Sequence, residues 1–279
     1  MEQGMLFDIA HSSFVDGPGI RTTVFFKGCN LQCAWCHNPE SQYGLPEMLY
    51  HRNKCTGCGA CREVCREESC ILCGECTKVC PVSARKICGR QYTVEEVLAE
   101  IRKDTLFYEM SGGGVTFSGG ECMLQVGFLK ELLKKCREEG IHTAVDTAGH
   151  VPWASFEEIL PYTDLFLYDI KCLTERLHRN GTGVSNQRIL GNLERLSMCF
   201  HGEILVRIPI IPGFNTDPEE LRSMAEFLDT INCRVEPLPY HRLGEHKYAA
   251  VGRKMTNYSV PSREDMEKIN DLFKKGNVL

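Results

Sequence analysis

The crowding of cysteines is the feature that most constrains how this chain can fold. Eleven of its 17 cysteines lie between Cys29 and Cys80, and the total number is odd. The first residues show no basic segment followed by an apolar core, so no secretory signal is predicted and we expect a cytoplasmic protein. Thiols stay reduced in the cytosol. The crowding therefore favours metal or cluster ligation over a disulfide framework.

The first three cysteines of this group have the spacing Cys29-x3-Cys33-x2-Cys36. Three thiolates can hold three irons of a [4Fe–4S] cluster and leave the fourth iron without a protein ligand. An open coordination position is typical of a catalytic metal site and not of a structural one. On spacing alone, two alternatives stay open: a zinc site completed by His37, and unliganded thiols on a loop.

Eight further cysteines form two consecutive runs that share the spacing x2, x2, x3. Bacterial two-cluster ferredoxins have this spacing, and in them the fourth cysteine of one run binds the cluster of the other. We therefore predict two auxiliary [4Fe–4S] clusters and three clusters in all, with zinc as the alternative. One auxiliary cluster takes Cys55, Cys58, Cys61 and Cys80, and the other takes Cys65, Cys70, Cys73 and Cys76. Because only residues 66–69 separate the runs, the pairing of the fourth ligands stays open.

After residue 90, amphipathic helical patterns alternate with short apolar runs. This alternation is typical of βαβ units with a parallel sheet. Together with an earlier run, six strands are predicted, too few for a closed eight-stranded barrel. The predicted fold class is α/β, a partial (β/α)6 TIM-type barrel. The predicted strands are Thr22–Phe26, Val115–Phe117, His142–Asp146, Leu165–Asp169, Ile204–Ile210 and Arg234–Leu238. The predicted helices are Val94–Lys103, Leu124–Glu139, Trp153–Leu160, Asn186–Phe200, Pro218–Thr230 and Ser262–Lys275.

Residues 48–89 contain eight cysteines and few large apolar side chains. Such a segment cannot bury much of a core by itself, so it must be held together by what its cysteines bind. We predict that residues 1–47 and 90–279 form the barrel. Residues 48–89 are predicted to form a ferredoxin-like module inserted between the first strand and the next helix.

Composition argues against two kinds of partner. The formal net charge is −5, whereas nucleic-acid binding depends on Lys and Arg that meet phosphates. No stretch approaches the roughly 18 apolar residues that a membrane-spanning helix needs. We therefore expect neither a nucleic acid nor a membrane as partner.

Polar side chains stand at or near the ends of the predicted strands, at Ser118, Asp146, Asp169 and Arg207. Taken singly, such residues are commonly helix caps or structural ion-pair partners. The carboxyl ends of parallel barrel strands, however, form the face that carries active sites. The four residues together therefore predict a site on this face.

The Cys29 run, with Trp35 before its third cysteine, resembles the signature of the radical S-adenosylmethionine (SAM) superfamily. The motifs around it are similar to those of glycyl-radical-enzyme activating enzymes, the pyruvate formate-lyase activase group. The insertion resembles the two-cluster domain that a subgroup of these enzymes carries. The motifs are Asp16–Arg21, Phe26–Cys29, Cys36–Glu40, Ser118–Glu121, Asp146–Gly149, Asp169–Lys171, Gly183–Asn186, Arg207–Pro209 and Leu238–Tyr248.

The resemblance implies an activity and its partners. An enzyme of this group cleaves SAM reductively to methionine and a 5′-deoxyadenosyl radical, which removes an α-hydrogen from one glycine of a partner enzyme. The implied partners are this glycyl radical enzyme and a low-potential electron donor such as flavodoxin or ferredoxin. The alternatives are a radical SAM enzyme acting on a different peptide or small molecule, and an electron-transfer iron–sulfur protein.

The resemblance also implies which residues take part. Cys29, Cys33 and Cys36 hold the SAM-binding cluster. Asp16 binds the peptide of the partner, and all four residues are predicted to be catalytic. Gly119 and Gly120 lack a Cβ, so their backbone can approach the methionine ammonium closely, and Glu121 adds negative charge nearby. A monovalent cation site is implied at Asp146, Thr147 and Asp169. The residues implied to bind SAM or to surround it are Trp35, His37, Gly119, Gly120, Glu121, Asp146, Thr147, Asp169, Lys171, Arg207 and His241.

Overall fold

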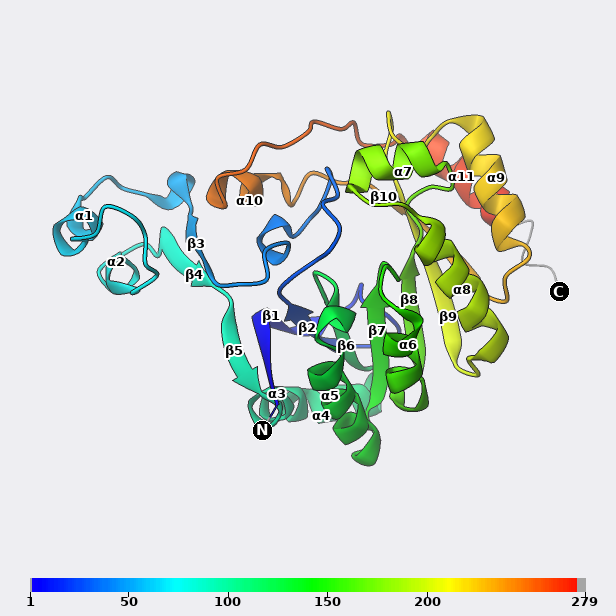
Figure 1. The fold of residues 1–279 in the computed structure, drawn as a ribbon, viewed down its shortest axis with the longest axis horizontal. Helices are drawn as coiled ribbons and strands as arrows, with labels where there is room; N and C mark the ends of the chain where they lie inside the picture. Colours follow the sequence, from blue (N-terminus) through cyan, green and yellow to red (C-terminus); the bar gives the residue numbers. More distant parts are fainter. Residues whose placement is uncertain (1, 275–279) are drawn as a thin grey trace.

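A computed structural model describes residues 2–274 and contains the predicted parallel sheet (Figure 1). Six parallel strands lie side by side in the order β10-β9-β8-β7-β6-β2. The partial (β/α)6 barrel is therefore confirmed. The strands are β2 (Arg21–Phe26), β6 (Gly114–Gly119), β7 (His142–Thr147), β8 (Leu165–Asp169), β9 (Glu203–Ile210) and β10 (Arg234–Pro239).

Two antiparallel strands that the sequence did not indicate extend the sheet beyond β2. β1 (Gln3–Ser13) pairs with β2 on one side and with β5 (Arg90–Thr93) on the other. The register of β1 shifts between Leu6 and Asp8 and again between Ala10 and Ser13. Such irregularities interrupt the alternation between core and solvent, which is why periodicity did not reveal this strand.

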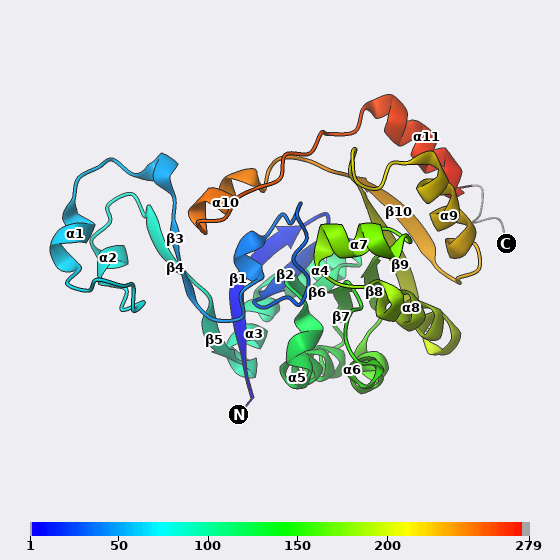
Figure 2. The same ribbon diagram turned by 45° about the horizontal axis from the view of Figure 1, so that its top comes forward.

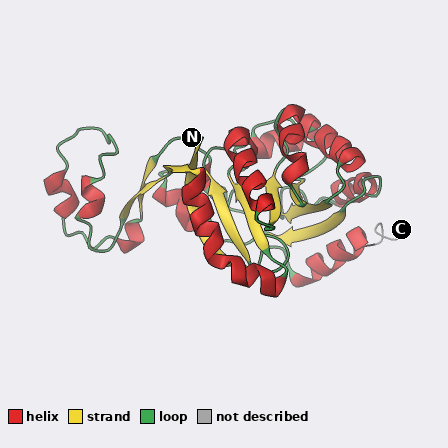
Figure 3. Cartoon of the chain, turned by 90° about the horizontal axis from the view of Figure 1, so that it is seen from below, coloured by secondary structure: helices red, strands yellow, loops and turns green. Residues whose placement is uncertain are grey.

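Helices cover the outer face of the sheet (Figure 3) and bury side chains such as Phe26, Phe117 and Phe166. Thr93 begins the first of them with a capping box to Glu96. In residues 2–274, no helix combines the length and the apolar character needed to cross a membrane. The helices at the predicted positions are α3 (Val94–Ile101), α5 (Val126–Glu138), α6 (Trp153–Ile159), α8 (Gln187–Cys199), α9 (Pro218–Leu228) and α11 (Arg263–Lys274). Further helices are α4 (Thr105–Ser111), α7 (Glu175–Thr182) and α10 (Glu245–Ala250).

The predicted helices agree with α3, α5, α6, α8, α9 and α11 to within a few residues. The one predicted over Leu124–Glu139 begins with the 3-10 turn Cys122–Gln125 and becomes α-helical at Val126. Lys275, the last residue of the predicted C-terminal helix, lies outside the described residues. α4 and α10 were not predicted, because so few turns do not establish a helical period, and α7 escaped because Leu177 is its one large apolar residue.

Residues 47–88 project from the edge of the barrel (Figures 1 and 2). The strands β3 (Glu47–Tyr50) and β4 (Arg85–Cys88) form an antiparallel stalk, and α1 (Ala60–Val64) and α2 (Glu75–Lys78) lie beyond it. Each of these helices follows a left-handed glycine, Gly59 at φ +82° and Gly74 at φ +81°. The two cysteine runs therefore turn in the same way. The buried apolar side chains of the projection are Leu49, Ala84 and Cys88, all on or beside the stalk.

Lys27, directly after β2, fixes the base of this stalk. Its buried ammonium donates to the carbonyl of Glu40 at 2.5 Å and pairs with the Glu47 carboxylate at 2.8 Å. Arg253 approaches the same carboxylate at 3.6 Å and donates to the carbonyl of Pro39 at 2.6 Å. Lys27 thus joins the barrel, the loop that follows β2, and the stalk.

Replacing Lys27 by Met is expected to lower the free energy of unfolding by about 3 kcal/mol, because it leaves the Glu47 carboxylate without its buried partner. The control is Lys86→Met, which removes a charge from an exposed position of the same stalk. Urea unfolding followed by circular dichroism measures both. Equal stability of the two variants would contradict this role of Lys27.

Candidate active site

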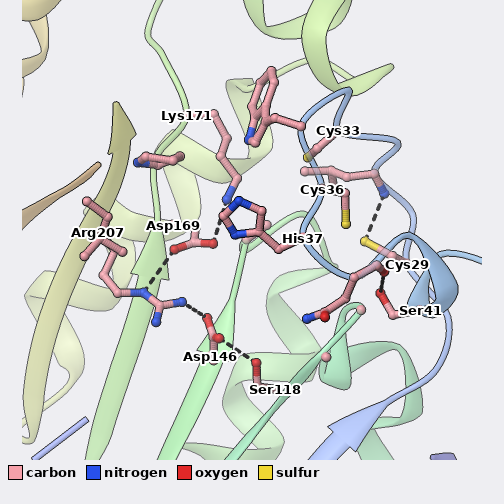
Figure 4. A pocket seen from close by; sticks show the side chains of 18 of the residues that line it. Cys29, Cys33, Cys36, His37, Ser41, Ser118, Asp146, Asp169, Lys171 and Arg207 are labelled. Atoms are coloured by element: carbon pink, nitrogen blue, oxygen red, sulfur yellow. Dashed lines mark hydrogen bonds and ion pairs between the residues drawn. The ribbon is translucent and has the colours of Figure 1, made fainter. Parts of the chain in front are cut away.

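A cavity of about 530 Å³ opens at the carboxyl ends of the parallel strands (Figure 4). All but one of the residues predicted for the SAM site line it, because parallel strands end on the same face of a barrel. The exception is Glu121. The predicted residues on the wall are Asp16, Cys29, Cys33, Trp35, Cys36, His37, Gly119, Gly120, Asp146, Thr147, Asp169, Lys171, Arg207 and His241.

The loop with the first three cysteines is held by backbone hydrogen bonds on two sides. Gln32 and Ala34 donate to the carbonyls of Thr182 and Gly181 at the end of α7, at 2.8 and 2.9 Å. Near its start, Gly28 donates to the carbonyl of Ser41 at 2.6 Å. These bonds fix the loop so that all three thiols lie on the cavity wall.

Trp35 anchors this loop from behind. Its ring packs on Phe214 with centroids 4.2 Å apart, and only 6% of the residue is exposed. Gly181 leaves room for the ring, since a Cβ there would lie 2.5 Å from Phe214 and 2.8 Å from Trp35. Trp35 thus packs the cysteine loop against Phe214 and also lines the cavity.

The thiols suit the ligation of a cluster. Burial raises the pKa of Cys33 to about 12 and also raises the pKa of Cys29 and of Cys36, so the thiols are neutral until a metal replaces their protons. Within residues 2–274, no three His, Cys, Asp or Glu side chains lie close enough to hold a single metal ion. The ligands of a cubane each bind a different iron and are therefore spaced farther apart.

Four charged side chains at the ends of β7, β8 and β9 form one wall of the cavity (Figure 4). Arg207 bridges Asp146 at 2.5 Å and Asp169 at 3.2 Å. Lys171 pairs with Asp169 at 2.6 Å, and the Ser118 hydroxyl donates to Asp146 at 2.6 Å. Two positive and two negative charges are thereby balanced on a largely buried surface.

The two carboxylates of this wall differ in their pKa. Burial disfavours ionisation of Asp169, but the charges of Lys171 and Arg207 outweigh it, so its pKa lies below the usual range. For Asp146, burial outweighs Arg207, and the pKa is raised. The resemblance implies the Asp146 and Asp169 carboxylates as ligands of a monovalent cation. Their oxygens already accept hydrogen bonds from Arg207, Lys171 and Ser118.

Gly119 and Gly120 are required by their packing against the end of β2. A Cβ on Gly119, at φ +109°, would lie 2.4 Å from the nitrogen of Phe26, and one on Gly120 would lie 2.2 Å from the oxygen of Gly28. Gly120 also donates to the carbonyl of Phe26 at 2.8 Å. The absence of a Cβ thus has a structural reason besides the predicted approach to a ligand.

The structure places Glu121 behind the wall and not on it. Its fully buried carboxylate accepts hydrogen bonds from the Thr147 hydroxyl at 2.8 and 2.9 Å and from the Ala148 N–H at 3.1 Å. Burial raises the pKa of Glu121 to about 7. That Glu121 adds negative charge near the ligand stays a prediction, and in this geometry its carboxylate positions the segment after β7.

Two histidines of the cavity wall form a stack, His37 on His241, with ring centroids 4.0 Å apart and an interplanar angle of 17°. The His37 Nε2 donates to the carbonyl of His241 at 3.0 Å. Burial, reinforced by His241, lowers the pKa of His37 to about 4, so this imidazole is neutral near pH 7. The stack joins the cysteine loop to the segment after β10.

Asp16 lies at another part of the wall, on the loop between β1 and β2. Its Oδ2 accepts hydrogen bonds from the hydroxyls of Ser13 at 2.6 Å and Thr23 at 2.7 Å. Its carbonyl accepts from Thr116 at 2.6 Å, and the buried Arg21 holds the same loop through the carbonyl of Pro18 at 3.1 Å. The carboxylate is fixed through one oxygen while Asp16 borders the cavity.

The predicted auxiliary ligands fall into the two sets given by the ferredoxin spacing. Cys55, Cys58, Cys61 and Cys80 line a second, smaller cavity at the end of the stalk. The remaining four are also neighbours: Cys65, Cys70 and Cys73 lie close enough to Cys76 to raise its pKa, in addition to burial. The crossover of the fourth cysteines is therefore compatible with the short spacer.

Three buried polar residues that sequence reasoning missed hold the segment after Lys171. Asn186 donates to the carbonyls of Cys172 and Leu173, and Asn215 donates to the carbonyl of Lys171 at 2.8 Å. Glu220 accepts from the N–H and the hydroxyl of Thr174. Their partners are distant in sequence, so no local pattern could reveal Asn215 or Glu220. Asn186 lies in a motif of the resemblance, without an assigned role there.

Comparison with known proteins defines the class first. Residues 23–228 match the model of the radical SAM superfamily, and the chain belongs to this superfamily. Its fold is also similar to a radical SAM methyltransferase from Sphaerobacter thermophilus, with a TM-score of 0.61, 13% identity, and coverage of 100% of this chain and 74% of the other.

Full-length relatives narrow the class. The chain is 42% identical to the trans-4-hydroxy-L-proline dehydratase activating enzyme of Clostridioides difficile, over 98% of this chain and 97% of the relative. It is 42% identical to the isethionate sulfite-lyase activating enzyme of Oleidesulfovibrio alaskensis, over 90% of this chain and 88% of the relative. It is 36% identical to the 4-hydroxyphenylacetate decarboxylase activating enzyme of Clostridium scatologenes, over 99% of this chain and 96% of the relative. The chain is a member of the glycyl radical enzyme activating enzymes.

The raised pKa of Glu121 predicts a pH dependence of stability. Between its ordinary value of 4.5 and about 7, the folded state keeps a proton that the unfolded state releases, so stability falls as pH rises. Gln does not titrate, so the free energy of unfolding of Glu121→Gln does not fall for this reason. Relative to wild type, it should rise by up to about 3 kcal/mol between about pH 5 and pH 8. Urea unfolding at both pH values measures the difference, with the exposed Glu194→Gln as control. A difference independent of pH would contradict the assignment.

Proposed function

We propose that the large cavity is the active site of this activating enzyme, with Cys29, Cys33 and Cys36 as ligands of the SAM-binding [4Fe–4S] cluster. The observation that carries the proposal is that three partly buried thiols and a charge-balanced wall border one cavity of about 530 Å³. This volume lies within the range of ligand cavities, about 300–1,000 Å³.

When bound, the cluster supplies the electron that cleaves SAM, and the 5′-deoxyadenosyl radical removes the glycine α-hydrogen. The protein's task is to bind, orient and keep water out. Lys171 and Arg207 offer N–H donors to carboxylate and ribose oxygens, while Asp169 and Asp146 balance charge. A zwitterion can exchange partners with these pairs without leaving a buried charge uncompensated.

The other side chains of the wall complete the proposed SAM site. The backbone of Gly119 and Gly120 borders the methionine end, and the His37–His241 stack offers a flat surface to a planar base. Glu121 acts as a positioning residue through Thr147. A monovalent cation at Asp146, Thr147 and Asp169 would bind only if Arg207 or Lys171 turned to the ligand, because these side chains already use the carboxylate oxygens.

Asp16 is proposed to grip the peptide of the partner. A glycine offers no side chain, so a loop that carries it must be held by its backbone. The Asp16 Oδ2 accepts from two hydroxyls, and no described residue hydrogen-bonds to its Oδ1. This oxygen can accept a peptide N–H at the border of the cavity. Such a grip would serve to hold the glycine α-carbon at a reactive distance of about 3–3.5 Å.

The projecting residues 48–89 are proposed to form a ferredoxin-like module with two auxiliary [4Fe–4S] clusters, held by Cys55, Cys58, Cys61 and Cys80 and by Cys65, Cys70, Cys73 and Cys76. The grouping of the thiols and the scarcity of buried apolar side chains support this. We propose that the module receives electrons from a low-potential donor such as flavodoxin or ferredoxin. The glycyl radical enzyme partner is proposed to be a dehydratase, lyase or decarboxylase, as for the relatives.

Iron content tests the cluster assignment. The reconstituted chain should hold about twelve irons, because each cubane contains four. Changing Cys29, Cys33 and Cys36 to Ala should leave about eight irons and abolish 5′-deoxyadenosine formation. Changing Cys73 and Cys76 to Ala should also leave about eight, yet keep SAM binding. Iron analysis and chromatography measure these outcomes. Twelve irons in the Cys29 triple variant would refute its ligands, and Cys199→Ala, at an exposed cysteine outside the runs, is the control.

Deuterium transfer tests Asp16. A peptide copying the partner's glycine loop, deuterated at the glycine α-carbon, should pass deuterium to 5′-deoxyadenosine. Asp16→Ala should lower this transfer about tenfold or more, the loss of a charge-assisted hydrogen bond, while peptide-free SAM cleavage falls less. Mass spectrometry reads both reactions, and Asp8→Ala on β1 is the control. Equal losses in both reactions would show that Asp16 does not hold the peptide.

A further inference from the structure

Arg85, the first residue of β4, borders the smaller cavity together with Cys55, Cys58, Cys61 and Cys80. Its guanidinium hydrogen-bonds to the Cys61 side chain and also interacts with Cys76 and Tyr50, none of them a carboxylate. Cys61 belongs to one predicted ligand set and Cys76 to the other. Cys76 lies on α2, which packs against β4, so Arg85 stands between the two sets.

The surroundings of Arg85 leave part of its hydrogen-bonding capacity unused. Its Nε is buried and has no hydrogen-bond partner. The guanidinium lies over the ring of Tyr50 at 4.8 Å, which orients the cation. A buried, unpaired donor is costly unless a group absent from the polypeptide satisfies it. The sulfurs of a cluster in the adjoining cavity would be suitable acceptors for this N–H.

Neighbouring groups also direct donors at the thiols of this cavity. The Ala84 N–H donates to the Cys80 sulfur at 3.2 Å, and the Tyr50 side chain hydrogen-bonds to that of Cys55. The backbone N–H groups of Arg85 and Val82 also hydrogen-bond to the Cys80 sulfur. The cavity thus directs several donors at sulfur, and Arg85 adds a full positive charge.

We propose that Arg85 is the shared counter-charge of the two auxiliary clusters and raises the reduction potential of both, more strongly at the Cys55–Cys58–Cys61–Cys80 site. The inference rests on the two-cluster module of the proposed function. Reduction adds one negative charge to a cluster, so a nearby cation stabilises the reduced form. Net charge and hydrogen bonds to the sulfurs are established determinants of cluster potentials. Arg85 is thus a positioning and tuning residue and touches no substrate.

The test is a redox titration of the reconstituted full-length chain, followed by electron paramagnetic resonance. Arg85→Gln should lower the reduced-to-oxidised ratio of the Cys55 cluster at fixed potential about tenfold, which corresponds to about 59 mV for a one-electron couple. The second auxiliary cluster should shift less, and the Cys29 cluster should not shift. Arg85→Lys keeps the charge and should stay near wild type. The control, Lys86→Gln, removes a charge from the next, exposed residue of β4 and should shift neither cluster.

Full iron content with unchanged potentials in Arg85→Gln would overturn the inference. If Arg85→Gln does not take up its iron, Arg85→Met takes its place in the comparison. Cluster loss in both neutral variants, with retention in Arg85→Lys, would support the need for the charge, and loss in all three would refute it. A wild-type chain with about four irons, or with a single cluster signal, would instead refute the two-cluster module itself.

Discussion

The face of the barrel that carries the large cavity depends on the balance of buried charge at β7, β8 and β9. Arg207 spans two carboxylates on neighbouring strands, and Lys171 neutralises the remaining charge of Asp169. An unpaired ion here would cost several kcal/mol, so no member of the set can leave without a substitute. This constraint fixes the strand ends relative to one another. It also makes the wall selective, because a ligand enters at low cost only if it brings both signs of charge.

The position of the three thiols depends in turn on elements far apart in the chain. The end of α7 holds one side of the cysteine loop, and the Gly28–Ser41 hydrogen bond closes its base. Lys27 and Arg253 then connect that base to Glu47 on the stalk. The barrel, the loop and the projecting module are thus joined by ion pairs at one junction. Any change there acts on the cysteine loop and the stalk together.

Much of this arrangement was accessible from the sequence, for identifiable reasons. Buried parallel strands have a distinct apolar pattern, so the six strands and the polar residues at their ends could be placed, and cysteine spacing is a local signal. Glu121 shows the limit: its motif was evident, but its hydrogen bonds to Thr147 and Ala148 depend on how β6 and β7 pack. The same holds for Gly119, which is crowded by Phe26 on a strand distant in sequence. β1 escaped because its register shifts break the pattern.

The relatives bear on how a partner is selected. Activating enzymes of a dehydratase, a sulfite-lyase and a decarboxylase are similar to this chain to comparable degrees, 36–42%. An activating enzyme of this family acts on a glycine of its partner, and a glycine has no side chain to distinguish one partner from another. The backbone contacts proposed for Asp16 therefore carry little information about the partner. Discrimination must come from surfaces outside the cavity, which contact the body of the partner enzyme and not its glycine loop.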